Sequence, residues 1–201
     1  MNTIQTFKEK KGKRILKIYQ DEDSVNPRED NDNLGKMVCF HSKYALGDNQ
    51  DIKREDFDSW EDLNKFLIKE KKAVLISPLY LYDHSGLRIK IGNFAGLLPQ
   101  GHAHFDSGQV GFVYTTKEDI KNWGTTKKKA EKILKEEAKI YDQYLAGDIF
   151  RYEVFKEKTC KTCKHCEEEF IDSCSGFYGI DEKEIFDNAG LKQKDFEEVT
   201  Q

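Results

Sequence analysis

The longest regular pattern in the sequence is an apolar stripe at helical spacing over residues 127–145. Apolar side chains recur there every three or four positions, which is the period of an α-helix with one buried face, and Gly147 follows as a stop signal. The other apolar segments are short and strand-like. A long helix among several strands predicts an α+β fold, with an antiparallel or mixed sheet and a few packed helices.

Shorter patterns predict where the other elements lie. Strands are expected over residues 14–20, 36–41, 73–82, 87–91, 109–114 and 148–157. Ser59 and Thr116 each stand three positions before an Asp, as helix-capping pairs do, so a helix is expected after each. Two short helices are expected near 181–188 and 193–199. Pro78 predicts an edge strand or a bulge, because proline cannot donate to a strand ladder.

Length and composition favour one domain. The chain has 201 residues, of which 37% are hydrophobic and 35% are charged, so we expect a single core beneath a charged surface. Residues 1–13 are polar and are expected to form a flexible N-terminal segment. Residues 14–201 are then expected to form one α+β domain, which includes a cysteine segment at 158–176.

The net charge and the hydropathy of the chain limit the classes of partner that we expect. The net charge of −4 excludes a generally basic surface for nucleic acid, although short basic runs such as residues 8–14 leave local binding open. No apolar stretch reaches the ~18 residues that a membrane helix needs, and the N-terminus lacks the apolar core of a signal peptide. We therefore expect a cytoplasmic protein with no membrane partner. The sequence does not set its oligomeric state.

Four of the five cysteines predict a metal site. Cys160, Cys163, Cys166 and Cys174 follow the order C-x2-C-x2-C-x7-C, with His165 inside as an alternative ligand. Paired thiolates at this spacing suit the tetrahedral preference of zinc, and four protein ligands make such an ion structural. An iron–sulfur cluster fits less well, because the fourth cysteine is distant and no proline follows it. Free buried thiols remain the other interpretation.

Asp, His, Ser and Gly cluster in the loops where strands are expected to end. A turn explains any one of these loops, because Asp and Ser bond to nearby amides and Gly allows positive φ. Together, however, the loops gather groups that could bind a second, unidentified metal or a partner, or act as an acid/base pair. The candidate binding residues are His41, Asp48, Asp83, His84, Ser85, His102, His104, Asp106 and Ser107.

Five motifs carry a resemblance to a known family. They are PRxDxDNLGxMVCxH at 27–41, YxLGD at 44–48, PLYLYDHSG at 78–86, DSGQVGF at 106–112 and DSCxGFYG at 172–179. In combination they resemble an uncharacterised family of small proteins that bacteriophages, plasmids and their Gram-positive hosts encode. Ser175 stands where that family commonly has Trp. The family has no established activity, so the resemblance implies a mobile-element gene and assigns no catalytic residue.

The sequence therefore favours a mobile-element accessory protein that binds a host protein, a nucleic acid or a small signalling molecule, for instance against a host defence system. The alternative is a metal-dependent hydrolase or nuclease that uses His41, Asp83, His84 and Asp106. In a third interpretation the loops are turns only, and the chain is an assembly component. Whether the chain is an enzyme is not decided at this level.

Overall fold

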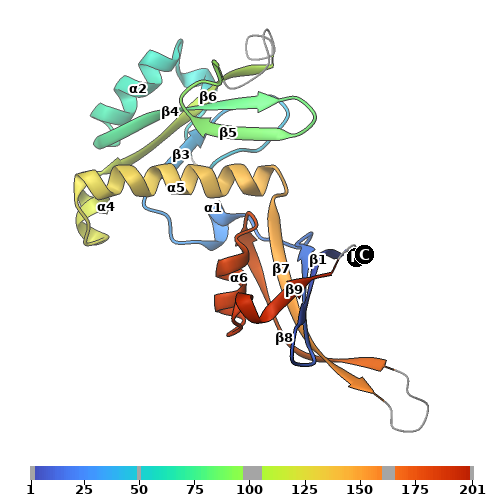
Figure 1. Cartoon of the computed structure of the whole chain (residues 1–201). Helices are drawn as coiled ribbons and strands as arrows, with labels where there is room; N and C mark the ends of the chain where they lie inside the picture. The colour runs from blue at the N-terminus through green and yellow to red at the C-terminus, as the bar shows by residue number, and fades with distance from the viewer. Residues whose placement is uncertain (1–2, 49–50, 97–105, 160–165, 200–201) are drawn as a thin grey trace. The chain divides into compact units, whose positions relative to one another are not determined.

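The computed structural model describes residues 3–48, 51–96, 106–159 and 166–199, and Figure 1 labels its elements. The chain divides into two compact units, where we expected a single domain: residues 1–24 with 147–201 form unit 1, and residues 25–146 form unit 2. The difference arises because β2 (Arg14–Gln20) pairs with β7 (Ile149–Thr159) across the whole of unit 2 in sequence. No local sequence pattern predicts a pairing between strands that lie so far apart in the sequence.

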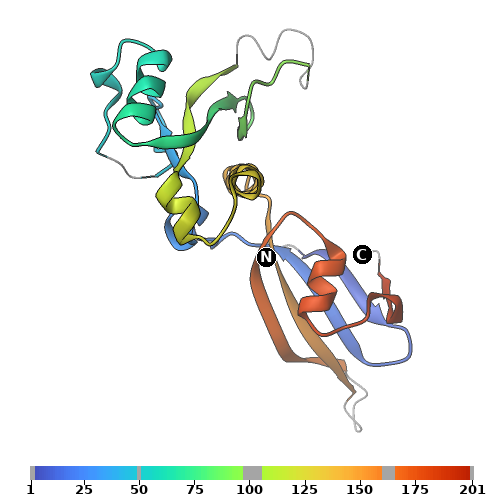
Figure 2. The same ribbon diagram turned by 90° about the vertical axis from the view of Figure 1, so that its left-hand side faces the viewer.

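Unit 1 is an antiparallel sheet with a helix on one face. Its strand order is β8-β7-β2-β1-β9, with β8 at Cys166–Tyr178, β1 at Thr3–Glu9 and β9 at Phe196–Glu198. Side chains alternate between the faces of a strand. On one face of this sheet, Leu16, Ile18 and Val154 pack with Ile185 and Phe186 of α6 (Glu182–Asn188), which lies against the sheet in Figure 2.

Residues 3–9 form β1, where the sequence analysis expected a flexible segment. β1 pairs with β2 on one side and with β9 on the other, and its Phe7 is buried in the core of unit 1. Phe7 also contacts Phe186 edge to face, with 5.2 Å between the ring centroids. A polar strand with a single buried aromatic residue gives little signal in the sequence, because its stability comes from its two neighbours.

Unit 2 is a second antiparallel sheet between helices. Its strand order is β3-β6-β4-β5, with β3 at Lys36–Cys39, β6 at Ser107–Thr116, β4 at Ala73–Asp83 and β5 at Leu87–Ile91. The α-helices of this unit are α1 (Pro27–Asp30), α2 (Trp60–Lys69), α4 (Lys117–Asn122) and α5 (Lys127–Leu145). Two 3₁₀ turns complete the described elements, η1 (Arg54–Asp56) in unit 2 and η2 (Gln193–Asp195) in unit 1.

The two longer helices of unit 2 cover opposite faces of its sheet. Met37 and Val113 point to the face that α5 covers through Leu134 and Tyr141. The next residues along the same strands, Val38 and Tyr114 among them, point to the other face, where they pack with Leu63 and Leu67 of α2. This alternation is the period of a β-strand, and it gives unit 2 two cores on one sheet.

Helix capping is confirmed at the two predicted starts. The Ser59 hydroxyl accepts a hydrogen bond from the backbone N–H of Asp62, at the start of α2. At the start of α4, Thr116 and Asp119 exchange both bonds of a capping box. These bonds satisfy N–H groups that lack a partner in the first turn of a helix. Because the bonds are local, the sequence alone locates the two helix starts.

Two local expectations have different outcomes. At Pro78 the second alternative is confirmed: β4 is flanked by β6 and β5 and is not an edge strand, but its register with β6 shifts just after Pro78, between Leu79 and Tyr80. The segment 193–199 is a 3₁₀ turn followed by β9, not a helix. Phe196 of β9 is buried in the unit 1 core, so tertiary packing overrides the local pattern there.

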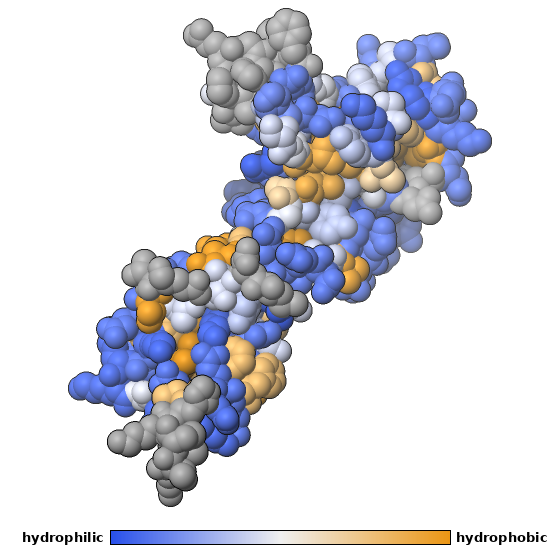
Figure 3. Space-filling model, turned by 90° about the vertical axis from the view of Figure 1, so that its right-hand side faces the viewer, coloured by the Kyte–Doolittle hydropathy of each residue, from blue (hydrophilic) through white to orange (hydrophobic). Residues whose placement is uncertain are grey.

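Among the described residues, no helix is long and apolar enough to span a membrane. On the face drawn in Figure 3, hydrophilic residues cover most of the surface, and hydrophobic residues form only limited patches.

Gly111 allows β6 to approach β3 closely. A Cβ atom at this position would lie 1.8 Å from the carbonyl oxygen of Val38, which is backbone and cannot turn aside. We expect Gly111→Ala to lower the free energy of unfolding by about 3 kcal/mol through overpacking. Gly108→Ala is the matched control, because nothing lies within 4 Å of its added Cβ on the same strand. Urea unfolding measures both, and equal midpoints would contradict the close approach.

Candidate functional site

The ends of three strands bring the predicted polar residues together in unit 2. β3 ends before His41, β4 ends at Asp83, and Asp106 immediately precedes β6. Because neighbouring strands of this sheet are antiparallel, the ends of β3 and β4 and the start of β6 meet at the same edge. Segments that are far apart in the sequence therefore contribute to one site.

A chain of contacts connects these residues. The ring of His41 stacks on that of Tyr44, with centroids 4.9 Å apart, and the Tyr44 Oη lies 3.5 Å from Asp83 Oδ1. The backbone N–H of Asp83 donates to the carbonyl oxygen of Asp106 at 2.9 Å. His84 Nδ1 lies 3.4 Å from Asp106 Oδ2, with half of the His84 side chain exposed.

We call His41, Asp83, His84, Asp106 and Ser107 the His/Asp cluster. All of them except His84 line a surface hollow of about 410 Å³, here called the polar hollow. The carboxylates accept hydrogen bonds, and each neutral imidazole offers one donor and one acceptor. In His41, Nδ1 accepts the backbone N–H of Lys43 at 3.3 Å, which places the proton of the neutral ring on Nε2. The hollow can therefore bind a polar group at several points.

Two further predictions in these loops have other outcomes. Ser85 has a positive φ of 57° and lies with Gly86 in the turn of the β4–β5 hairpin, so it is placed as a turn residue. His102 and His104 lie outside the described residues.

Asp48 is not part of the cluster, because it pairs with the buried side chain of Arg28. The Arg28 side chain is only 1% exposed, and its Nε and Nη2 donate to the two carboxylate oxygens of Asp48 at 2.7 and 3.0 Å. Arg28 also donates to Asn33 Oδ1 and to the carbonyl oxygen of Gly35. Asp48 Oδ2 accepts the N–H of Met37 as well. We therefore interpret Asp48 as a structural anchor.

Glu137 of α5 completes this buried network. Its two carboxylate oxygens accept the backbone N–H groups of Leu34 and Gly35 at 2.7 and 2.9 Å, and Oε2 lies 3.6 Å from Arg28 Nη1. The side chain is 9% exposed. Burial raises the pKa of Glu137 above its ordinary value, and the hydrogen bonds and the guanidinium oppose that rise only in part.

The same region fixes the loop over residues 40–48. The backbone N–H of Gly47 donates to Tyr141 Oη at 2.9 Å, and that of Asp48 donates to the carbonyl oxygen of Met37 at 2.9 Å. Gly47 has a φ of 72°, and a Cβ there would lie 2.7 Å from Met37 O. The base of the loop is thus tied to α5 and β3, and the loop carries His41 and Tyr44 into the site.

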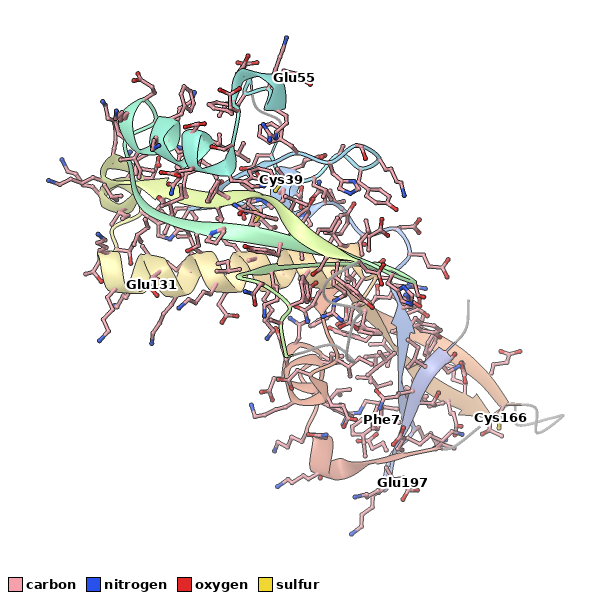
Figure 4. All side chains as sticks on the ribbon, turned by 90° about the horizontal axis from the view of Figure 1, so that it is seen from above. Phe7, Cys39, Glu55, Glu131, Cys166 and Glu197 are labelled. Carbon is pink, nitrogen blue, oxygen red and sulfur yellow. The ribbon has the colours of Figure 1, made fainter. Side chains whose placement is uncertain are left out.

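A second, larger hollow lies beside the polar one and was missed by sequence reasoning. It has a volume of about 880 Å³, and we call it the aromatic hollow. Its lining residues include Phe40, His41, Tyr44, Asp48, Arg54 and Trp60. Cys39 and Glu55, which are labelled in Figure 4, also line it. Phe40 and Trp60 fit the pattern of core residues in the sequence, so no local signal separates them from the core.

The cysteines are placed only in part. Cys166 is the first residue of β8 and pairs with Thr159, whereas Cys174 pairs with Tyr152 further along the same strand. Eight residues of strand separate the two Cα atoms by roughly 26 Å, so Cys174 does not join Cys166 on one ion in this structure. The described residues therefore place Cys166 and Cys174 apart, and the full expected ligand set stays a prediction. Cys160, Cys163 and His165 lie outside the described residues.

Cys39 is not activated as a nucleophile. Burial raises the pKa of its thiol to about 12, so the thiolate is scarce at neutral pH. Within the parts of the chain that the structure describes, no three His, Cys, Asp or Glu side chains are arranged to hold a metal ion.

Comparison with known proteins gives no relative from which a function can be transferred. No protein-family model, no curated protein and no solved structure matches this chain.

The raised pKa of Glu137 makes stability depend on pH. Between the ordinary value of 4.5 and the raised value, the folded protein holds a proton that the unfolded chain has released. This contribution is fully present below pH 4.5 and is lost as pH rises through the raised pKa. We therefore expect the free energy of unfolding, relative to that of Glu137→Gln, to decline as pH rises above 4.5.

Urea unfolding at a series of pH values measures this difference. Glu136→Gln is the control, because Glu136 is exposed on the same helix. A Glu137→Gln difference that stays constant with pH would contradict the assignment.

Proposed function

We propose that the chain is an accessory protein of a phage or plasmid that binds a host protein, a nucleic acid or a small signalling molecule through unit 2. The observation that carries this proposal is the convergence of the His/Asp cluster from three strand ends on one open hollow. The resemblance of the motifs supplies the mobile-element setting, in which blocking a host defence is one use of such binding.

The way the loops are held supports a binding role. The buried Arg28–Asp48 pair and the Gly47–Tyr141 bond fix the backbone beneath His41 and Tyr44. A loop that is already fixed loses less conformational entropy when a ligand binds, which raises affinity. Residues on rigid supports with partly exposed polar ends are therefore well suited to recognition.

A metal-dependent hydrolase or nuclease is the second candidate. The observation that favours it is the His84–Asp106 pair at 3.4 Å beside Asp83, since an imidazole held by a carboxylate can transfer protons or bind a metal. A second metal of unknown identity would have to recruit these side chains into a new arrangement, because the described residues do not present a ready group of three ligands.

The charge of the cluster provides the test. We expect the double substitution Asp83→Asn and Asp106→Asn, which keeps the shape of both side chains, to reduce capture of a host partner about tenfold or more, since charge-assisted bonds are lost. The control is Glu131→Gln with Glu136→Gln, an equal charge change at two exposed positions of α5. Captured material is quantified as protein, nucleic acid and nucleotide.

Two outcomes separate the candidates. If the wild-type protein cleaves nucleic acid with Mn²⁺ and the cluster variant does not, the hydrolase replaces the binding protein. If the cluster variant captures the same partners as the control variant and cleaves nucleic acid as the wild type does, the His/Asp cluster is not the functional site in either candidate function.

We also propose that the cysteine segment holds a structural zinc ion. Because Cys174 lies eight strand residues from Cys166 on β8, the proposed ligands are Cys160, Cys163, His165 and Cys166. These residues lie close together in sequence and offer zinc the thiolate and imidazole ligands it prefers.

Single substitutions distinguish this ligand set from the one expected from sequence. Metal analysis of purified protein should find about one zinc per chain in the wild type and in Cys174→Ser, and little in Cys163→Ser, which loses a thiolate. Loss of zinc from Cys174→Ser would restore the original set. A metal-free wild type with freely alkylated thiols would end the zinc proposal.

A further inference from the structure

The aromatic hollow presents rings in an arrangement that a folded core does not require. Phe112 and Tyr114, which belong to the core on this face of the sheet, are almost fully buried. Phe40 and Trp60 pack against the same core but are only partly buried, and they line the hollow. Partly buried rings that gather in a concave surface are typical of ligand sites.

The first wall of the hollow is a row of stacked planar groups. Phe40 and Trp60 are stacked, with centroids 6.3 Å apart and an interplanar angle of 21°. The guanidinium carbon of Arg54 lies 5.2 Å from the centroid of the Trp60 ring, and Arg54 is held there by a hydrogen bond to the carbonyl oxygen of Phe57. Aromatic rings and guanidinium planes are the groups on which unpaired nucleobases stack in proteins.

The second wall repeats this chemistry. His41 and Tyr44 form a parallel pair, with an interplanar angle of 11°, on the loop that the Arg28–Asp48 network fixes. Hydrogen-bonding groups stand among the rings. Asn26 lines the hollow and donates from Nδ2 to Glu29 Oε1, and Ser42 lines it as well. A flat heteroaromatic ligand uses both kinds of group, with its faces on the rings and its edge on the polar atoms.

We propose that the aromatic hollow binds a small molecule with a nucleobase, such as a nucleoside or a nucleotide. Its volume of about 880 Å³ falls within the range of small-molecule sites. Lys53 and Arg54 can contact a phosphate, but Glu29 and Glu55 line the same hollow and balance their charge. Stacking of the base is therefore the main source of affinity, and a phosphate is an addition to it.

The inference goes beyond the proposed function, because it assigns a ligand class to a second hollow of unit 2. The two sites can be separated experimentally, because Arg54 and Trp60 line only the aromatic hollow, while Asp83 and Asp106 line only the polar hollow.

Trp60 itself reports binding. The chain has two tryptophans, and the second, Trp123, is exposed after α4, so Trp123→Phe leaves Trp60 as the single indole. This protein is titrated with adenosine, guanosine, cytidine, uridine and their monophosphates, with ribose 5-phosphate and inorganic phosphate as ligands that lack a base. We expect saturable quenching of Trp60 fluorescence by at least one base-bearing ligand and none by the base-free ligands.

Substitutions in the two walls test the geometry. Arg54→Gln and Tyr44→Leu, each made in the Trp123→Phe background, are expected to weaken binding about tenfold, since each removes one stacking group. Lys132→Ala, on the exposed side of α5, is expected to bind as the parent does. Circular dichroism confirms that each variant is folded.

Several results would overturn the inference: no saturable quenching by any base in the folded protein, equal binding of ribose 5-phosphate, or unchanged affinity in both wall variants. Tight binding of single-stranded oligonucleotides without binding of mononucleotides would also overturn it, in favour of a nucleic acid. If partner capture depends on Asp83 and Asp106 but no base binds, this inference fails and the proposed function stands. If bases bind but the double Asp83→Asn, Asp106→Asn variant still captures its partners, the proposed function fails and this inference stands.

Discussion

The buried guanidinium of Arg28 is the interaction on which the site in unit 2 depends. A charge taken out of water is costly unless its donors are bonded and its charge is balanced. Here Asp48 supplies two carboxylate acceptors, Asn33 and Gly35 supply neutral ones, and Glu137 stands 3.6 Å away. These partners come from the segment after α1, the loop that follows β3, and α5. One side chain therefore fixes three parts of unit 2 relative to one another.

Local signals in the sequence predict local structure well. The bounds of β2, β5 and α5 agree with the sequence patterns, because alternation or helical spacing together with a turn signal at the end defines each. The division into two units could not be predicted in this way. It follows from the pairing of β2 with β7 and from the position of β1 between β2 and β9, and these long-range contacts leave no periodic trace.

In the candidate site, too, features set by local sequence could be predicted and features set by long-range contacts could not. The sequence placed His41, Asp83 and Asp106 at strand ends, but their convergence also depends on the strand order, in which β3 and β4 both flank the antiparallel β6. The structural role of Asp48 could not be predicted, because an acidic loop residue has the same appearance whether it faces a ligand or pairs with an Arg elsewhere in the chain. Phe40 and Trp60 were missed for a related reason, since only the folded structure shows that their rings are partly buried and line a hollow.

The buried network also bears on whether the motif loops are turns and nothing more. A turn needs only local bonds, and replacing a buried ion pair with apolar side chains of similar volume is often neutral or stabilising. A guanidinium held by four hydrogen bonds gives what apolar packing gives less well, a single defined position for the loop it contacts. That loop carries His41 and Tyr44, and their stacked rings line the aromatic hollow. We infer that the loop is held for recognition, because a turn alone requires no such precision.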